Sequence, residues 1–302
     1  MKYNYEFNYS LGRRKMKSSI YDKYDRIVFL DTETSGLDYS KNQIIELAMY
    51  SVNKDGTTAE YDHFVRLERE AELPERIIQL TGIMPLTLAT KGIPEKAMCN
   101  DFTETAGTEN KTLLVAYNAQ FDLMFIAMSL VRQKDRDSLV AFNGCDYLDA
   151  MTVYKDRAEY PHKLETAIRH YSLEDKVVNS HRAIDDTYAL AAVFDAMADE
   201  RDDLERYINL FGYNEKYGIS GRKMKKITYL PQDMYSGIKD EAHALYTQKQ
   251  KTCTKPNVEH GSIEGSHLSI EGYGIQQNMK ERSSGYSAPL REEKNPFKDV
   301  FS

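Results

Sequence analysis

From residue 26 onward, short apolar segments alternate with polar turns. Segments 26–31, 43–52 and 60–66 are short and rich in β-branched and aromatic residues, which is typical of strands. The sequence Asn53-Lys-Asp-Gly56, between the second and third segments, predicts a hairpin-type turn. The apolar run 112–117 predicts a further buried strand.

Longer segments between and after these strands predict helices. They are residues 74–80, the stretch after Pro94, and residues 121–132, 163–171 and 184–197. Because strands and helices alternate along the chain, we expect an α/β fold in which helices flank a mixed β-sheet.

The character of the sequence changes at both ends of this α/β region. We interpret residues 1–24 as a polar N-terminal extension and residues 25–213 as one folded domain. Residues 214–235 form a basic segment, with five basic and no acidic residues between Lys216 and Lys226. Residues 236–302 contain few apolar clusters, which predicts a largely disordered C-terminal tail.

Composition narrows the class of protein. Hydrophobic residues make up 41% of the 302 residues and charged residues 29%, as in soluble globular proteins. We expect no membrane span and no secretory signal, because no apolar run is long enough. Three widely spaced cysteines predict no disulfide framework, so a cytoplasmic location is expected. The net charge of −7 argues against nonspecific coating of nucleic acid, but not against an enzyme that grips a few nucleotides.

Two carboxylates follow the first predicted strand, in Asp31-Thr-Glu33. Residues i and i+2 of a strand point to the same side, so Asp31 and Glu33 should project together. Such closely spaced acids repel each other unless a cation lies between them, which predicts a metal site. A pair of solvated acids at a strand end is the alternative.

Two further acidic sites precede predicted helices. Asp122 follows a buried strand and opens a helix, at the sheet edge where α/β proteins usually bind ligands. Taken alone, it is also compatible with an acid that the helix dipole stabilises. The sequence Ser180-His-Arg-Ala-Ile-Asp-Asp186 places His181 before two acids, of which only one can face a given site. Ordinary capping beside a surface histidine would also explain it.

Together these sites resemble the motifs of the DnaQ-like (DEDDh) 3′–5′ exonucleases, the family of the proofreading epsilon subunit of bacterial DNA polymerase III. The matching sequences are Asp31-Thr-Glu33-Thr-Ser-Gly36, Asn118-Ala-Gln-Phe121-Asp122 and His181-Arg-Ala-Ile-Asp-Asp186. The resemblance covers roughly residues 25–200 and implies a ribonuclease H-like fold. The family spacing of His-x4-Asp selects Asp186 over Asp185.

The resemblance also implies a chemistry. Members of the family hydrolyse a phosphodiester at a 3′ end with two divalent ions, and oxygen ligands favour Mg²⁺ or Mn²⁺. Asp31, Glu33 and Asp186 are then expected to hold one ion, and Asp31 and Asp122 the other. His181 is expected to act as general base. Expected substrate contacts are Thr34, Gly36, Leu37, Asn118 and Phe121, each of which also fits a packing or turn role.

The expected substrate is a single-stranded or frayed 3′ end of DNA, as in replication proofreading or repair. A DNA polymerase or replisome partner is expected only by analogy. The alternative enzyme is a 3′–5′ exoribonuclease. A contact to the 2′-hydroxyl would distinguish RNA from DNA, and no residue in the sequence can be identified with such a contact. A non-catalytic nucleic-acid-binding module would be expected to lack a ligand position, whereas all five family positions are present. The basic segment could clamp a phosphate backbone or be a solvated linker.

Overall fold

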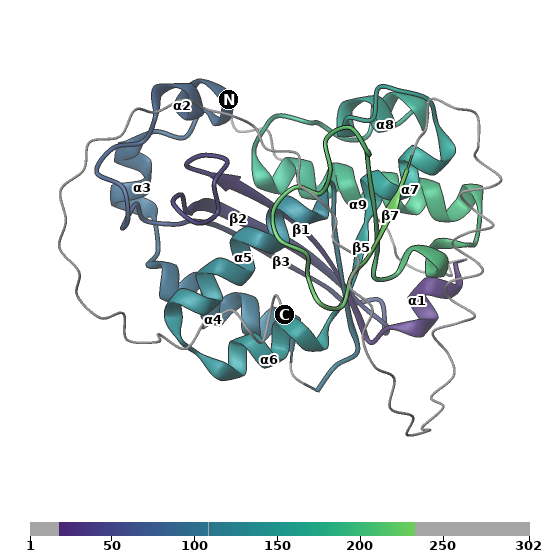
Figure 1. The fold of residues 1–302 in the computed structure, drawn as a ribbon, viewed down its shortest axis with the longest axis horizontal. Helices are drawn as coiled ribbons and strands as arrows, with labels where there is room; N and C mark the ends of the chain where they lie inside the picture. Colours follow the sequence, from purple (N-terminus) through teal and green to yellow (C-terminus); the bar gives the residue numbers. More distant parts are fainter. Residues whose placement is uncertain (1–17, 108, 233–302) are drawn as a thin grey trace, which may run out of the picture.

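The computed structural model describes residues 18–107 and 109–232. A five-stranded sheet in the order β3-β2-β1-β4-β5 lies at its centre (Figure 1). Strands β1, β2 and β3 pair antiparallel, whereas β1, β4 and β5 pair parallel. The strands are β1 (Arg26–Thr34), β2 (Ile44–Asn53), β3 (Thr58–Phe64), β4 (Thr112–Ala116) and β5 (Asp146–Asp149).

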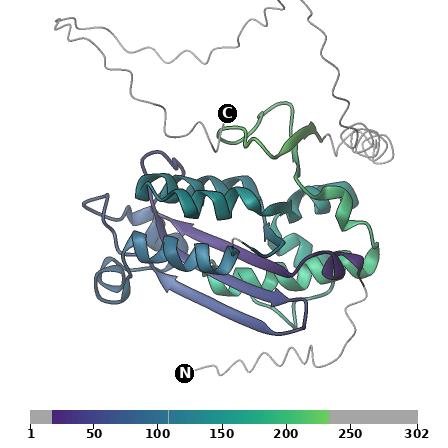
Figure 2. The ribbon, with the colours of Figure 1, turned by 90° about the horizontal axis from the view of Figure 1, so that it is seen from below.

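Helices cover both faces of the sheet (Figure 2). One face packs against α1 (Ser19–Lys23), α7 (Ala150–Arg157), α8 (Leu164–His170) and α9 (Ala183–Glu200). The other face packs against α4 (Glu95–Ala106), α5 (Ala119–Gln133) and α6 (Arg136–Gly144). The expected ribonuclease H-like mixed sheet flanked by helices is confirmed.

Alternation along β1 assigns its side chains to these two faces. Ile27 and Phe29 belong to the core on the α9 side, whereas Val28 and Leu30 belong to the core on the α5 side. The period of two extends this assignment along the strand. Asp31 and Glu33 therefore share the α9 side, and Thr32 belongs to the α5 side.

Strand β1 is longer than the sequence predicted. It was expected over 26–31 but continues to Thr34, because β2 pairs with it as far as Thr34↔Ile44. Both acids of the first motif therefore lie within a paired strand and not in the turn after it. The paired backbone fixes their spacing more tightly than a loop would.

Four α-helices were not predicted: α1, α3 (Pro85–Lys91), α6 and α7. They have little continuous apolar periodicity, and tertiary packing stabilises them. The other predicted helices are present, as α2 (Glu75–Thr81), α4, α5, α8 and α9, with ends shifted by a few residues. The hairpin-type turn is also present, and its Gly56 adopts a positive φ of 84°.

The first described residues belong to the core. Helix α1 buries Ile20 and Tyr21, and Tyr24 follows it into the interior. The core therefore starts a few residues before the expected domain start at residue 25. The remaining part of the predicted N-terminal extension, residues 1–17, and the predicted tail, 236–302, lie outside the described residues.

After α9, a short helix (η1, Leu204–Tyr207) leads into a second, two-stranded sheet. Its strands β6 (Leu210–Tyr213) and β7 (Thr228–Pro231) run parallel. Most of the predicted basic segment connects them, and this green segment lies outside α5 in Figure 2.

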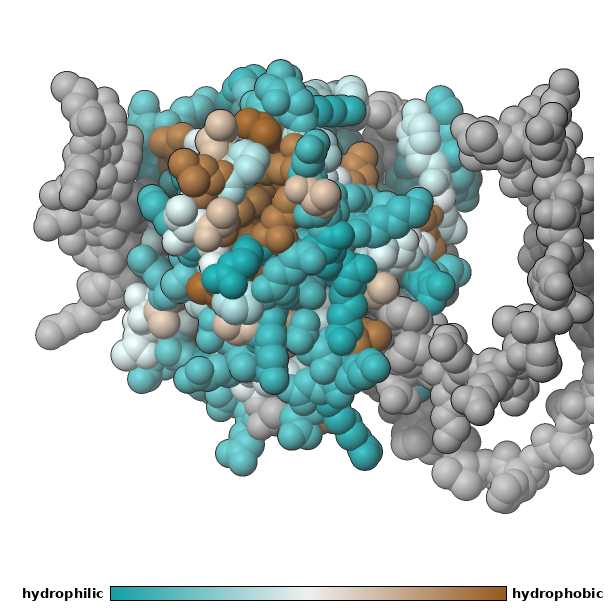
Figure 3. Space-filling view, turned by 90° about the vertical axis from the view of Figure 1, so that its left-hand side faces the viewer, coloured by the Kyte–Doolittle hydropathy of each residue, from teal (hydrophilic) through white to brown (hydrophobic). Residues whose placement is uncertain are grey.

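Helices α2 and α3 pack on a small core of their own, formed by Ile45, Leu73, Ile83 and Leu88. Their outer surface exposes Leu80, Met84 and Leu86. The side of the molecule that carries these helices shows a gathering of hydrophobic residues in Figure 3.

Among the described residues, no helix combines the length and apolar character that a bilayer crossing requires. Cys99 and Cys145 are both buried free thiols. The third cysteine, Cys253, lies outside the described residues.

Candidate active site

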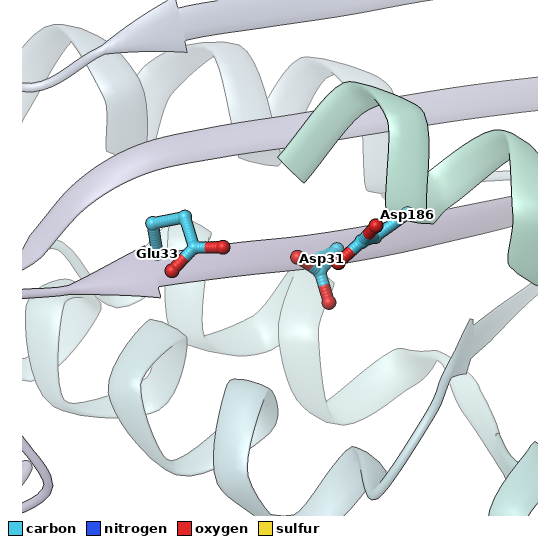
Figure 4. A group of neighbouring side chains, drawn as sticks. All are labelled: Asp31, Glu33 and Asp186. Atoms are coloured by element: carbon cyan, nitrogen blue, oxygen red, sulfur yellow. The ribbon is translucent and has the colours of Figure 1, made fainter. Parts of the chain in front are cut away.

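Three carboxylates from two elements converge at the end of β1. Asp31 and Glu33 come from β1 and Asp186 comes from the first turn of α9 (Figure 4). One oxygen of each lies within 4.8 Å of the other two. Asp186 can reach the pair because α9 covers the face of the sheet to which both strand acids point.

Burial and mutual repulsion raise the pKa values of these acids. Burial, followed by repulsion from Asp122 and Asp186, raises the pKa of Asp31 well above its usual value. Burial, followed by repulsion from Asp186 and Glu46, raises the pKa of Glu33 to about 8. Burial raises the pKa of Asp186 to about 7. A cluster of oxygens that cannot ionise together at neutral pH fits a hard divalent cation, whose charge would remove the repulsion.

Asp122 approaches from the opposite face of the sheet. It is buried in the first turn of α5, and its Oδ1 accepts hydrogen bonds from the amide of Thr32 (3.0 Å) and from Thr32 Oγ1 (2.7 Å). Burial raises its pKa to about 7. Asp122 is therefore held against Thr32, which lies between Asp31 and Glu33. It does not belong to the group formed by Asp31, Glu33 and Asp186.

His181 lies on the loop that leads into α9, with a positive φ of 57° and an exposed side chain. The loop wraps around Asp186: the amide of Ser180 donates to Asp186 Oδ1 at 3.2 Å, and the backbone of His181 also donates to this carboxylate. The neighbouring Asp185 instead accepts a hydrogen bond from Ser180 Oγ at 2.5 Å. Of the two adjacent acids, only Asp186 joins the three-carboxylate group.

The sequence analysis did not single out the ion pair between Glu46 and Arg182. Glu46 is fully buried on β2, directly opposite Glu33 in the register. Arg182 donates to both of its carboxylate oxygens at 2.5–3.2 Å, and the amide of Ala183 donates to Oε2 at 3.2 Å. The pair ties the His181 loop to the central sheet. A charged residue within the otherwise apolar run 44–50 was the signal that could have revealed it.

Asp149 was also missed. It is buried at the end of β5 and accepts hydrogen bonds from the amides of Asn118 (2.9 Å) and Ala119 (3.1 Å). These contacts hold the start of α5, and with it the position of Asp122. An acid that ends a short apolar strand was the available signal.

The five expected substrate contacts lie around this edge of the sheet. Thr34 is buried and donates to the carbonyl of Gly36 at 2.7 Å, which shapes the turn after β1. Leu37 is 81% exposed at that turn. Asn118 is exposed with a φ of 64°, and Phe121 packs partly on Phe125. Their roles in substrate binding stay predictions.

Residues 28–194 match the family model RNase_T, described as exonuclease. The curated relative from Staphylococcus haemolyticus, a DNA polymerase III of PolC type, is 34% identical over 180 residues, which cover 59% of this chain and 12% of the relative. The PolC-type polymerase of Staphylococcus epidermidis strain RP62A is 29% identical over 240 residues, or 79% of this chain and 14% of the relative. The chain thus spans only a small part of the curated relatives it matches.

Among solved structures, E. coli Exonuclease I in complex with a dT13 oligonucleotide superposes with a TM-score of 0.53 at 20% identity. The superposition covers 61% of this chain and 43% of that one. At 20% sequence identity, this similarity is evidence for a shared fold only. The family model matches more than half of the chain and includes Asp31, Glu33 and Asp186, and the chain therefore belongs to the DnaQ-like exonuclease family of enzymes.

Proposed function

We propose that this protein is a divalent-metal-dependent 3′–5′ exonuclease that hydrolyses phosphodiester bonds at the 3′ ends of DNA. The observation that carries the proposal is the group of Asp31, Glu33 and Asp186 within 4.8 Å, inside the part of the chain that matches the exonuclease family. Its all-oxygen donor set suits Mg²⁺ or Mn²⁺ better than softer metals.

Each acidic residue has a proposed place in this site. Asp31, Glu33 and Asp186 would hold one ion, and Asp31 together with Asp122 a second. When bound, the two ions supply Lewis-acid stabilisation of the attacking and leaving oxygens of the displacement. The hydrogen bonds from Thr32 support the role of Asp122, because they orient its carboxylate without neutralising it.

His181 would act as general base and accept the proton of the attacking water. Two observations support this role: the side chain of His181 is exposed, and its loop donates a backbone hydrogen bond to Asp186. The exposed Leu37 would contact the terminal base, and Asn118, Phe121, Thr34 and Gly36 would shape the pocket for the terminal nucleotide.

DNA is proposed as the substrate because the curated relatives are DNA polymerases, and because the solved relative holds a DNA oligonucleotide. A role in proofreading or repair beside a DNA polymerase follows from the same relatives. A cytoplasmic location remains our expectation from the sequence.

The test uses single-stranded oligonucleotides labelled at the 5′ end, with matched DNA and RNA sequences. Purified protein with Mg²⁺ or Mn²⁺ should shorten DNA stepwise from the 3′ end, and EDTA should stop the reaction. A phosphorothioate at the 3′-terminal linkage should slow it. Faster degradation of the RNA would indicate that the protein is an exoribonuclease. If neither oligonucleotide were degraded, the proposed activity would be contradicted.

A separate assay tests the proposed role in proofreading beside a DNA polymerase. Duplexes whose primer ends in a matched or a mismatched nucleotide should be compared in single-turnover assays. A proofreading enzyme acts on frayed ends, so the mismatched primer should be shortened faster. Equal rates would argue against a role in proofreading.

A further inference from the structure

The basic segment is folded against the start of α5, the helix that carries Asp122. Residues 214–227, here called the basic loop, connect β6 with β7 and lie outside the residues that match the exonuclease family. The family model therefore does not describe this loop. The sequence left open whether this stretch is a solvated linker or a clamp.

Hydrogen bonds attach the loop to the start of α5. Gln120 Nε2 donates to the carbonyl of Arg222 at 2.7 Å, and Gln120 Oε1 accepts from the hydroxyl of Tyr229 at 2.7 Å. That hydroxyl also accepts from the amide of Met224 at 2.9 Å. Gln120 lies two residues before Asp122, so these bonds anchor the loop beside the second motif.

Packing fixes the loop at two further points. Met224 is 4% exposed and belongs to the core on the α5 side of the sheet. Gly221 lies so close to Tyr39 that an added Cβ would stand 3.2 Å from its ring, and its φ of +83° also favours glycine. Tyr39 follows the turn that carries Leu37. The loop therefore spans the start of α5 and the segment after the first motif.

The outer surface of the loop is cationic. Lys216, Lys223 and Lys225 are exposed, and within the described part of the chain no carboxylate forms an ion pair with them. Lys226 differs, because it pairs with Asp146 at 2.7 Å and donates to the carbonyl of Cys145 at 2.5 Å. One lysine thus anchors the loop, whereas three present their charge to solvent.

An aromatic side chain stands among these charges. Tyr217 is 76% exposed, and the ammonium of Lys216 lies 5.2 Å from its ring centroid. Exposed aromatic rings interleaved with lysines are the combination that binds single strands, because bases stack on the rings and phosphates pair with the ammonium groups.

We propose that the basic loop binds the backbone of single-stranded DNA upstream of the 3′-terminal nucleotide. The inference rests on the proposed function, which places that nucleotide at the three-carboxylate group. Lys223 and Lys225 contact phosphates, and Tyr217 provides a stacking surface for a base.

The test compares Lys223→Ala/Lys225→Ala and Tyr217→Ala with a control, Lys96→Ala/Lys134→Ala. The control removes two exposed lysines from α4 and from the far end of α5. Binding of fluorescent dT12 is measured with Ca²⁺ in place of Mg²⁺, from about 50 to 300 mM salt. Hydrolysis of the p-nitrophenyl ester of thymidine 5′-monophosphate, which has no upstream strand, is measured with Mg²⁺.

Loss of two phosphate contacts should reduce the slope of log K against log[salt] by about 1.4, at roughly 0.7 per contact for a single strand. Tyr217→Ala should weaken binding about 5-fold or more without a change of slope, because stacking is not ionic. The control should bind as the wild type does. None of these variants should hydrolyse the small ester more slowly.

An unchanged dT12 affinity and slope in Lys223→Ala/Lys225→Ala would overturn the proposal. So would an equal loss in the control, or a loss of ester hydrolysis that matches the loss of binding. Failure of the proposed function gives a different result, in which the wild type hydrolyses neither the ester nor an oligonucleotide. The binding data from Ca²⁺ still decide the role of the loop in that case.

Discussion

His181 combines an exposed imidazole with a left-handed backbone, which few non-glycine residues adopt. Asparagine tolerates this conformation well, so His181→Asn removes the proposed base with little added strain. We expect kcat to fall by roughly 10² or more, while Mn²⁺ affinity stays close to wild type. Turnover of a labelled oligonucleotide and Mn²⁺ titration measure the two quantities.

His63→Ala, an exposed histidine on β3, is the matched control and should retain full turnover. Wild-type turnover in His181→Asn would remove His181 from the chemistry. A parallel loss of Mn²⁺ affinity would show that the substitution disturbs Asp186 instead.

Two adjacent acids offer a sharp comparison, because only one belongs to the carboxylate group. Asp186→Asn should lose metal binding and activity, since the amide removes one charged ligand. Asp185→Asn should retain both, because the Asp185 carboxylate accepts a hydrogen bond from Ser180 and lies outside the three-carboxylate group. Isothermal titration with Mn²⁺ gives the affinities, and equal losses in the two variants would contradict the assignment of Asp186.

At the level of elements, Arg182 connects the start of α9 to β2. Arg182→Ala leaves the fully buried Glu46 without its cationic partner, although the amide of Ala183 still donates to it. We expect a loss of about 1–3 kcal/mol in the free energy of unfolding, below the 3–5 kcal/mol of a fully buried pair because the side chain of Arg182 is 37% exposed. Urea denaturation measures this loss.

Glu46→Gln in the Arg182→Ala background removes the uncompensated charge and should recover part of the lost stability. No recovery in the double variant would show that the two residues are not coupled. Activity should fall in Arg182→Ala in parallel with loosening of the His181 loop, and Arg182→Lys should restore part of it.

Element by element, the sequence was most informative where periodicity is strong. All five strands of the central sheet except β5 were predicted. Strands β1, β2 and β4 have largely apolar sequences, and β3 follows a hairpin-type turn. The end of β1 was placed too early. The acids Asp31 and Glu33 suggest a strand end when the pairing with β2 is not known. The helices α6 and α7 were missed because contacts with the rest of the domain stabilise them more than their own sequence does.

For the whole molecule, the clustered acids make stability depend on pH. Glu33, Asp122 and Asp186 have pKa values of about 8, 7 and 7 in the folded chain, all raised from the ordinary value near 4. Between pH 4 and 8 the folded state therefore binds more protons than the unfolded state. The free energy of unfolding without metal should fall as pH rises through this window.

Thermal unfolding in EDTA checks this expectation. The Tm of the wild type should fall more steeply between pH 5.5 and pH 8 than that of Asp31→Asn/Glu33→Gln, in which two of the acids no longer ionise. Identical pH profiles would show that the cluster does not govern this dependence.

Divalent ions should reverse the trend, because they bind the ionised carboxylates. At a Mg²⁺ or Mn²⁺ concentration one hundred times Kd, the folded state should gain about 2.7 kcal/mol. The rise in Tm should be larger at pH 8 than at pH 5.5, where protons compete with the ion. If the rise in Tm were independent of pH, the ion would bind at a site other than this carboxylate group.

The sequence by itself determined which side chains could act together. The period of two along β1 puts Asp31 and Glu33 on one side of the sheet, and local motifs point to Asp122, His181 and Asp186. Only the tertiary structure decided which of these meet. Helix α9 lies on the face to which the strand acids point, so Asp186 completes their group, whereas Asp122 on the other face is held through Thr32. The roles of Glu46 and Asp149 as anchors, and the docking of the basic loop on α5, depend on contacts between residues distant along the chain. A local pattern can mark such an acid as unusual, but it does not identify its partner.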